Sequence, residues 1–543
     1  MKTLKYIFSA FALTAGLLVT SCVGDLEVEP IDPSLNTSNN ALKTPADYEA
    51  FLAQCYVGFA TSGSYGPNGN NNISGLDGGQ SQYLRGLYHL NGLTTDEAVC
   101  GWNDQTIQDL HGHAWTTTDT FIAAFYYRVF YQIAMFNEFL RQAANISVEV
   151  PEMDVYKAEV RTLRAYCWLH AIDHFGNVPF ADETAQIGKD VPERIERADL
   201  FNYIETELKD IIENSAISAP GTAPYGRVDK VAAQMILARL YLNAEVYIGT
   251  PKYEECAAVC KAIATDGTYR LHTTKHGTAA DISVFQELFL ADNHKCTDEI
   301  IWAIEQNSGV TESYGVTNYI VFASTGGSMD TNMTGAGISS GWGGIRTTPE
   351  FYRLFSDGDS RKLFHTDGHT ESIDDITEFA NGYAFVKFRN VESDGETVPG
   401  ATYDEKKATW SMPGFVSVDW PVFRYADVHL MLAECALHEN VTSVSRSEGL
   451  DNINQVRQRA GLAPLTDAYY TLDEVLNERG REFAQECYRR SDLIRHGKFT
   501  SNMTWQWKGG EKNGKETSDH LCLFPIPESD KNANPNLKQN IGY

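Results

Sequence analysis

Basic residues are scarce in this sequence. It has 44 Lys and Arg against 72 Asp and Glu, so the formal net charge is −28 at pH 7. Nucleic-acid-binding proteins neutralise phosphates with Lys and Arg, and adhesion to an anionic lipid surface needs the same positive charge. We therefore exclude nucleic acid as a partner, and we do not expect electrostatic attachment to a membrane.

Long apolar runs are missing beyond the N-terminus. Residues 6–19 are mostly apolar, but they fall short of the about 20 residues that a membrane-spanning helix needs. They follow Lys2 and Lys5, and this order is typical of a secretory signal segment. We therefore expect the rest of the chain to lie outside the cytoplasm.

Small residues precede a cysteine directly after this segment. The residues Val19-Thr20-Ser21-Cys22 resemble a bacterial lipobox, in which the cysteine is acylated and becomes the new N-terminus. Stable anchoring takes at least two lipid chains, which an acylated Cys22 would supply. We predict a signal peptide over residues 1–21 and a lipid-anchored tether over 22–43. An ordinary signal peptide with a chance cysteine is the alternative.

Local signatures of catalysis and of metal binding are absent from the sequence. It contains no GxSxG elbow and no P-loop, and His89, His111 and His113 form no helix-spaced ligand pair with a nearby glutamate. Residues 356–360 (SDGDS) hint at a calcium loop but lack the spacing and final glutamate of an EF-hand. We expect no catalytic residue, no cofactor and no metal.

A regular cysteine framework is also lacking. Besides Cys22 there are nine cysteines, an odd number, and several fall on apolar faces of predicted helices, where cysteine packs as a small hydrophobe. Cys256 and Cys260 are four residues apart, but no histidine or cysteine pair lies nearby in sequence to complete a zinc site. We expect core cysteines, although an exported protein is free to form disulfides.

Helical periodicity is what the sequence has in abundance. Apolar residues recur at steps of three and four along five stretches, as on one face of a helix. These stripes are Val160/Leu163/Cys167/Ala171, Val231/Met235/Ala238/Leu242, Tyr253/Ala257/Cys260/Ala264, Tyr425/Val428/Leu432/Cys435 and Leu472/Leu476/Phe483/Cys487. Residues 228–265 have the length of a tetratricopeptide-like helical hairpin, with a helix start expected at Asp229.

Three tracts rich in Gly, Ser, Thr and Asn separate the helical stretches, at residues 61–81, 307–347 and 389–416. Loops of this length in compact proteins are usually functional. We predict a mainly α fold of tetratricopeptide-like helix pairs that carries long irregular insertions. A few short strands are expected, such as one over residues 300–304.

Arginines lie within the predicted helices, close in sequence to acidic residues. Arg161, Arg164, Arg479 and Arg481 are expected to form buried or half-buried ion pairs between helices, because the planar guanidinium suits carboxylates. Gly480 interrupts a good helix at a cost of about 1 kcal/mol, which predicts a close contact there.

Five segments, in this order along the chain, resemble the SusD/RagB family of surface lipoproteins. They are RTLRAYCWLHAIDHFGNVPF (161–180), GRVDKVAAQMILARLYLNA (226–244), FRYADVHLMLAECAL (423–437), ERGREFAQECYRRSDLIRHGKF (478–499) and LFPIPESDKNANPNLKQNIGY (523–543). Within the family the likeness is greatest to the starch-binding member, which LDGG (76–79), LTTDEAV (93–99), LFLADN (288–293) and WQWKGGEKNG (505–514) also resemble.

The resemblance implies an α-helical fold and a protein that binds glycans without catalysis. It implies a place on the outer membrane, facing outward, as the lid of a SusC-like TonB-dependent transporter that imports oligosaccharides. It also implies an N-terminal region over residues 44–280, with the tetratricopeptide-like helices, and a SusD/RagB C-terminal region over 281–543. An α-glucan such as starch is the first expected ligand.

The irregular tracts and their neighbours offer the side chains that glycan recognition needs. Aromatic faces stack on pyranose rings, and fork-like polar groups reach adjacent hydroxyls. The aromatic candidates are Trp102, Tyr314, Tyr319 and Trp342, and the polar candidates are Asp77, Arg85 and Gln105. Core packing is the alternative for each aromatic, but Trp342 is flanked by residues too small to cover its ring.

Four of these positions, Asp77, Arg85, Tyr314 and Trp342, fall where the resemblance to the starch-binding member implies ligand contacts. The resemblance fails at Cys100, which stands where that member has a sugar-stacking tryptophan, and Gln105 replaces an asparagine. Two other functions stay open at this point. One is a non-binding helical scaffold, and the other is a glycoside hydrolase, whose two carboxylates about 5–9.5 Å apart need no local signature.

Overall fold

The computed structural model describes residues 42–69, 71–185 and 191–543. The predicted signal peptide, Cys22 and all but the last two residues of the tether lie outside the described residues. Residues 49–543 form one unit by their contacts. Among the described residues, no helix combines the length and the apolar character needed to cross a membrane.

The structure is mainly helical, as predicted, with short strands. The α-helices are α3 (Pro45–Val57), α4 (Tyr83–Asn91), α5 (Gln105–Gly112), α6 (Thr120–Ala144), α7 (Met153–His174), α8 (Arg197–Asn214), α9 (Lys230–Leu242), α10 (Ala244–Ile248), α11 (Tyr253–Asp266), α12 (Val284–Glu287), α13 (Val316–Ala323), α14 (Pro349–Tyr352), α15 (Tyr425–Cys435), α16 (Arg446–Arg459), α17 (Leu472–Phe483), α18 (Arg489–Arg495) and α19 (Glu528–Ala533). Single turns of 3-10 helix are η1 (Asn293–Lys295), η2 (Asp467–Tyr469), η3 (Lys508–Gly510) and η4 (Asp519–Cys522).

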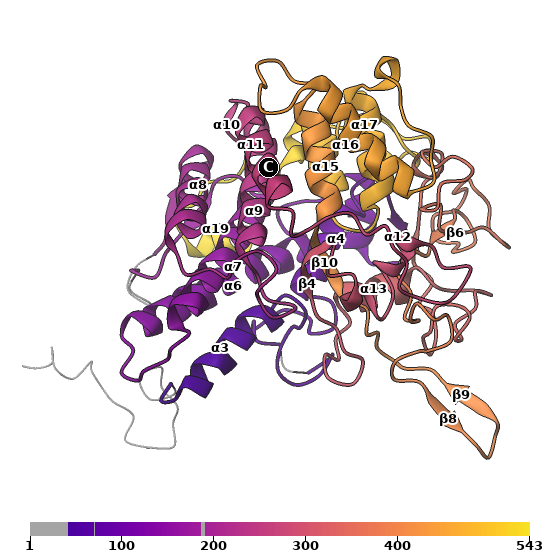
Figure 1. The fold of residues 1–543 in the computed structure, drawn as a ribbon, viewed down its shortest axis with the longest axis horizontal. Helices are drawn as coiled ribbons and strands as arrows, with labels where there is room; N and C mark the ends of the chain where they lie inside the picture. The colour runs from indigo at the N-terminus through magenta and orange to yellow at the C-terminus, as the bar shows by residue number, and fades with distance from the viewer. Residues whose placement is uncertain (1–41, 70, 186–190) are drawn as a thin grey trace, which may run out of the picture. The chain divides into compact units, whose positions relative to one another are not determined.

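The longer helices pack in succession. α6 packs on α7, α7 on α8, α8 on α9, α9 on α11, α11 on α15, and α15 on both α16 and α17. Figure 1 shows these helices gathered on one side, with irregular chain and short strands on the other. The predicted hairpin of residues 228–265 is confirmed as α9 and α11, with the short α10 between them.

The start of α9 illustrates how the sequence sets these helices. Asp229 is the N-cap, and its Oδ1 accepts hydrogen bonds from the N–H groups of Val231 and Ala232, which no helical carbonyl can satisfy. Ala233 and Ala238 are fully buried, and their small side chains allow the neighbouring helices to approach closely. Propensity, capping and burial therefore agree in this element.

The strands form two-stranded antiparallel ribbons. They are β1 (Val99–Cys100) with β5 (Ile345–Arg346), β2 (Val178–Phe180) with β3 (Glu193–Ile195), β4 (Ile300–Ile304) with β10 (Trp420–Arg424), β6 (Phe364–His365) with β7 (Ala384–Phe385), and β8 (Thr402–Asp404) with β9 (Thr409–Ser411). The predicted strand 300–304 is confirmed as β4, and β4 and β10 are buried at every position. β4 contacts α9, and β10 contacts α15.

The last predicted stripe is wrong at its C-terminal end. α17 ends at Phe483, and the chain continues with Gln485 and Cys487 at positive φ, 62° and 66°, before α18 begins. Two non-glycine residues in the left-handed region cannot belong to a helix. Cys487 therefore lies in a tight connection between two helices and not on the face of α17.

Ion pairs between helices are confirmed for three of the four predicted arginines, and the prediction is wrong for Arg481. Arg161 and Arg164 of α7 both bind Glu207 of α8. Arg479 of α17 binds Asp427 of α15 and Asp492 of α18, whereas Arg481 pairs within its own helix. A Cβ at Gly480 would lie 2.9 Å from Arg489 Nη1 and 3.2 Å from Leu354, so the predicted close contact is also confirmed.

The described cysteines are unpaired. Seven of the nine are buried, and Cys487 and Cys522 are half-buried. The prediction of core cysteines therefore holds for most of them, since a buried cysteine packs as a small hydrophobe. Cys296 differs, because its Sγ lies 3.9 Å from His276 Nδ1.

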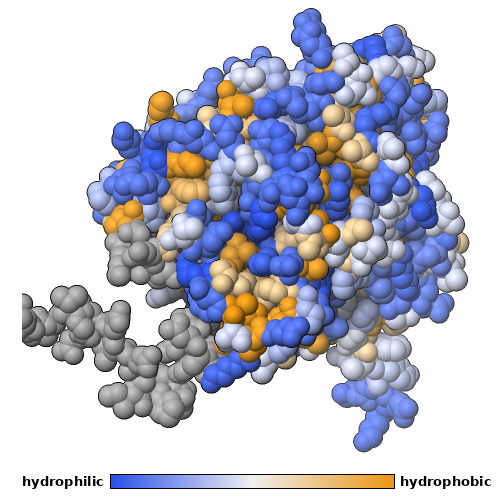
Figure 2. Space-filling view, turned by 60° about the vertical axis from the view of Figure 1, so that its left-hand side comes forward, coloured by the Kyte–Doolittle hydropathy of each residue, from blue (hydrophilic) through white to orange (hydrophobic). Residues whose placement is uncertain are grey.

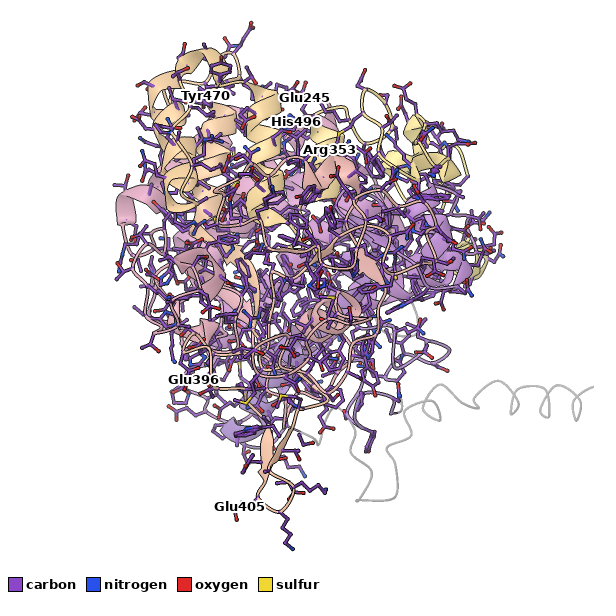
Figure 3. All side chains as sticks on the ribbon, turned by 90° about the vertical axis from the view of Figure 1, so that its right-hand side faces the viewer. Glu245, Arg353, Glu396, Glu405, Tyr470 and His496 are labelled. Atoms are coloured by element: carbon purple, nitrogen blue, oxygen red, sulfur yellow. The ribbon has the colours of Figure 1, made fainter. Side chains whose placement is uncertain are left out.

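The irregular tracts remain largely without regular structure, as predicted. Within residues 307–347 only α13 and the short β5 are regular, and within 389–416 only the β8–β9 hairpin is. This hairpin projects from the rest of the unit, and Figure 3 shows Glu405 at its end. Its facing aromatic side chains, Tyr403 and Trp410, are each 50% exposed.

Candidate functional site

Four aromatic rings from three separate segments form a continuous row, which we call the aromatic arc. It consists of Trp102, Trp342, Tyr314 and Phe415. Ring centroids lie 6.3 Å apart for Trp102 and Trp342, 5.8 Å for Trp342 and Tyr314, and 5.5 Å for Tyr314 and Phe415. All four side chains are half-buried, so each is held by neighbours and keeps part of its surface accessible.

Trp342 is positioned by the C-terminal end of α13. The N–H groups of Trp342, Gly343 and Gly344 donate to the carbonyls of Phe322, Thr325 and Ala323, each at 2.8 Å. The last carbonyls of a helix have no partner within the helix, so a neighbouring extended segment can satisfy them. Gly343 has φ of +57°, which favours glycine in this segment.

Trp102 is positioned by the β1–β5 ribbon and by a glycine. β1 ends at Cys100, and the N–H of Gly101 then donates to the carbonyl of Gly344 at 3.1 Å. A Cβ on Gly344 would lie 2.6 Å from the indole of Trp102, closer than real Cβ contacts. The absence of a side chain at residue 344 therefore lets this ring lie beside Trp342.

Arg85 lies beneath the arc and not in it. It is 5% exposed, and its Nη1 donates to the carbonyls of Gly79 and Tyr314, at 2.9 and 3.1 Å. Its guanidinium carbon lies 4.4 Å from the ring centre of Tyr319, and burial lowers its pKa. These two bonds from Nη1 give Arg85 a positioning role beneath the arc, and its contact with sugar hydroxyls stays a prediction.

The expectation for Tyr319 is corrected. It lies on α13 with no exposed surface, and its ring contacts Trp102 edge-on at 6.0 Å. A ring without exposed area offers no face to a sugar, so Tyr319 supports Trp102 from below. The burial follows from α13 itself, every residue of which is buried.

The two remaining polar candidates are exposed. Asp77 lies in the 61–81 tract, and its Oδ1 accepts a hydrogen bond from the N–H of Gly79 at 2.8 Å, which leaves its other oxygen available. Gln105 begins α5, three residues after Trp102, and its Nε2 donates to Asp109 at 2.8 Å. Cys100 is fully buried in β1, so a ligand could not reach its side chain.

Sequence reasoning missed one member of the arc and one separate cluster. Phe415 lies in the 389–416 tract, where nothing distinguished it from other apolar residues, and only the fold places it on Tyr314. His272, His276 and Cys296 lie together with ligand atoms within 4.8 Å of one another. The spacing of the two histidines was a usable signal, but Cys296 is twenty residues further on.

The arc has the geometry of a surface for flat, partly apolar ligands. Its rings are tilted or edge-on to one another, with interplanar angles of 52° for Trp102 and Trp342 and 74° for Trp342 and Tyr314. Asp77 and Gln105 lie exposed on other segments.

Comparisons with known proteins agree with this architecture. A family model described as "SusD family" matches residues 380–543. Starch-binding protein SusD from Bacteroides thetaiotaomicron is 31% identical over an alignment that covers 100% of this chain and 99% of that protein. SusD-like protein P25 from Formosa agariphila is 23% identical over 77% of this chain and 78% of that protein.

Solved structures share the fold. Surface glycan-binding protein A from Bacteroides fluxus covers 92% of this chain and 100% of its own, with a TM-score of 0.67 and 21% identity. Surface glycan-binding protein A from Bacteroides thetaiotaomicron, in complex with laminarihexaose, has a TM-score of 0.66 at 19% identity over 92% of this chain and 100% of its own.

Proposed function

This chain belongs to the SusD family, and we propose that it binds oligosaccharides on the aromatic arc, without cleaving them, for delivery to a SusC-like TonB-dependent transporter. The observation that carries the proposal is the row of four half-buried rings. Two of them pack on buried rings, Trp102 on Tyr319 and Trp342 on Phe322. Side chains held in this way lose little conformational entropy on binding, which favours recognition.

Trp342 and Tyr314 stack on sugar rings in this proposal, and Trp102 and Phe415 extend the surface at either end. Asp77 and Gln105 provide hydroxyl contacts. Each polar contact contributes only about 0.5–1.5 kcal/mol net, and each stacked ring about 1 kcal/mol. We therefore expect dissociation constants between about micromolar and millimolar. Oligosaccharides should bind more tightly than monosaccharides, because several rings contact the arc at once.

An α-glucan is the first ligand to test, since the starch-binding protein SusD is a full-length relative. The complex of a more distant structural relative with laminarihexaose supports a second candidate. Calorimetric titration with maltooligosaccharides, laminarihexaose and a fructan would identify the ligand. If no glycan binds, the protein is a scaffold of the uptake complex. Release of reducing ends from a bound glycan would make it a glycoside hydrolase.

Trp342→Ala tests the location of the site. It removes one stacking surface and should weaken glycan binding about fivefold or more, which corresponds to about 1 kcal/mol. Trp410→Ala is the matched control, because that indole is half-exposed and packs on Tyr403 in the projecting hairpin. Equal affinities for the parent protein and Trp342→Ala would show that the site lies elsewhere.

The partner proposal draws on exposed apolar residues outside the arc. Val57 and Val310 are 44% and 81% exposed and line one hollow of about 480 Å³. Tyr126, Phe130 and other residues of α6 and α7 line a second hollow of about 510 Å³, and Figure 2 shows several hydrophobic patches between hydrophilic ones. Co-purification with a channel from outer membranes in mild detergent is expected. Recovery of the free monomer alone would argue against the partnership.

A further inference from the structure

The chain segment between α11 and β4 brings together four side chains with donor atoms of the kinds that zinc prefers. His272 and His276 lie in the segment before α12, Glu287 is the last residue of α12, and Cys296 follows η1. Glu287 and Cys296 are fully buried, and His272 is 4% exposed. Three different chain segments therefore direct nitrogen, oxygen and sulfur atoms to one point.

The distances match ligands that share one ion. Glu287 Oε2 lies 3.0 Å from His272 Nε2 and 3.3 Å from His276 Nδ1. Cys296 Sγ lies 3.9 Å from His276 Nδ1. Ligands held tetrahedrally at ordinary Zn–N, Zn–O and Zn–S lengths are about 3.3–3.6 Å apart. Ligand atoms of His272, His276 and Cys296 all lie within 4.8 Å of one another, and the donors would draw closer together around an ion.

Outer carboxylates lie beside both histidines. His272 Nδ1 lies 2.9 Å from Asp298 Oδ1, and this arrangement of carboxylate and imidazole fixes the ring so that Nε2 faces the other donors. His276 Nε2 makes no hydrogen bond and lies 3.6 Å from Asp292 Oδ2, ready to donate to it. Glu287 Oε1 accepts from the N–H of Gly277 at 2.7 Å, which holds that carboxylate in place.

We propose that His272, His276, Glu287 and Cys296 bind a structural zinc ion. Imidazole and thiolate donors favour zinc over calcium or magnesium, which take oxygen ligands. Four protein ligands leave no open position, so the ion stabilises the fold and does not catalyse. His276 is 22% exposed in its side chain and provides the entry path. The ion fastens the segment before α12 to the residues that lead into β4.

The test is a zinc titration of chelator-treated, purified protein against a chromophoric competitor, with cobalt as a spectroscopic probe. One ion per chain is expected, together with a thiolate-to-cobalt charge-transfer band and a higher unfolding temperature with zinc. Asp298→Asn should weaken zinc binding by about 10–100-fold, because it removes only the partner that orients His272. Cys296→Ser should abolish the charge-transfer band.

His276→Ala is the second variant that removes a proposed zinc ligand. It was chosen because a partly exposed side chain contributes less to folding than a buried one. His294→Ala is the matched control, an exposed histidine two residues from Cys296, and it should bind zinc as the parent does. If the parent binds no zinc, or if Cys296→Ser and His276→Ala bind it as tightly as the parent, the four residues form a hydrogen-bonded cluster only and the proposal fails.

Discussion

We predict that the free energy of unfolding depends on pH through the buried carboxyl group of Glu97. Glu97 lies two residues before β1, the strand that leads to Trp102, and it is 4% exposed. Its Oε1 accepts a hydrogen bond from the N–H of Gln485 at 2.9 Å. Burial is the main cause that raises the pKa of Glu97 from 4.5 to about 8, and neighbouring Asp96 raises it further. The carboxyl group is therefore protonated in the folded protein at neutral pH.

Because the folded-state pKa lies above the unfolded value, the unfolded state releases this proton first as pH rises. The free energy of unfolding should fall between about pH 4.5 and about pH 8, the two pKa values. One pKa unit corresponds to about 1.4 kcal/mol, so the loss is at most about 4–5 kcal/mol. Glu97→Gln replaces the acid by a neutral group of the same shape and removes this pH dependence.

The assay is denaturant unfolding of the parent and of Glu97→Gln at about pH 5 and about pH 8.5. The variant should gain at least about 2 kcal/mol relative to the parent between the two conditions. Any packing difference adds a constant offset and leaves this change untouched. Glu405→Gln, at the end of the projecting hairpin (Figure 3), is the control. A difference between Glu97→Gln and parent that does not vary with pH would refute the reasoning.

Three further predictions concern Gly344, Arg424 and Cys22. Gly344→Ala should push the indole of Trp102 aside and weaken glycan binding. Gly414→Ala is the control and should not weaken binding, because open space surrounds a Cβ there. Calorimetry compares the glycan affinities of the two variants. Arg424→Met removes the cation shared by Glu299, Glu482 and Glu486, which keep their other partners, Arg459 and Lys387 among them. It should cost about 3 kcal/mol in denaturant unfolding, and a loss below about 1 kcal/mol would contradict it. Cys22→Ala should move the protein from the membrane fraction to the soluble one, and persistent membrane association with the signal peptide cleaved would count against the lipid anchor.

The helices were largely predictable because their causes are local. Caps such as Asp229 and apolar stripes at steps of three and four act over a few residues, so the sequence alone identifies α7, α9, α11 and α15. The end of α17 was missed because Cys487 continues the apolar spacing, whereas the backbone at Gln485 turns into the left-handed region.

By itself the sequence determined the acidic composition, the helical class, the resemblance to a family and the aromatic candidates near irregular tracts. Only the tertiary structure decided which candidates keep exposed surface: Trp342 and Tyr314 remain half-buried, while Tyr319 is covered because α13 is buried on every side. It also brought Phe415 into the arc and Cys296 to two histidines. Contacts between distant segments depend on how the chain packs, and no spacing within one segment encodes them.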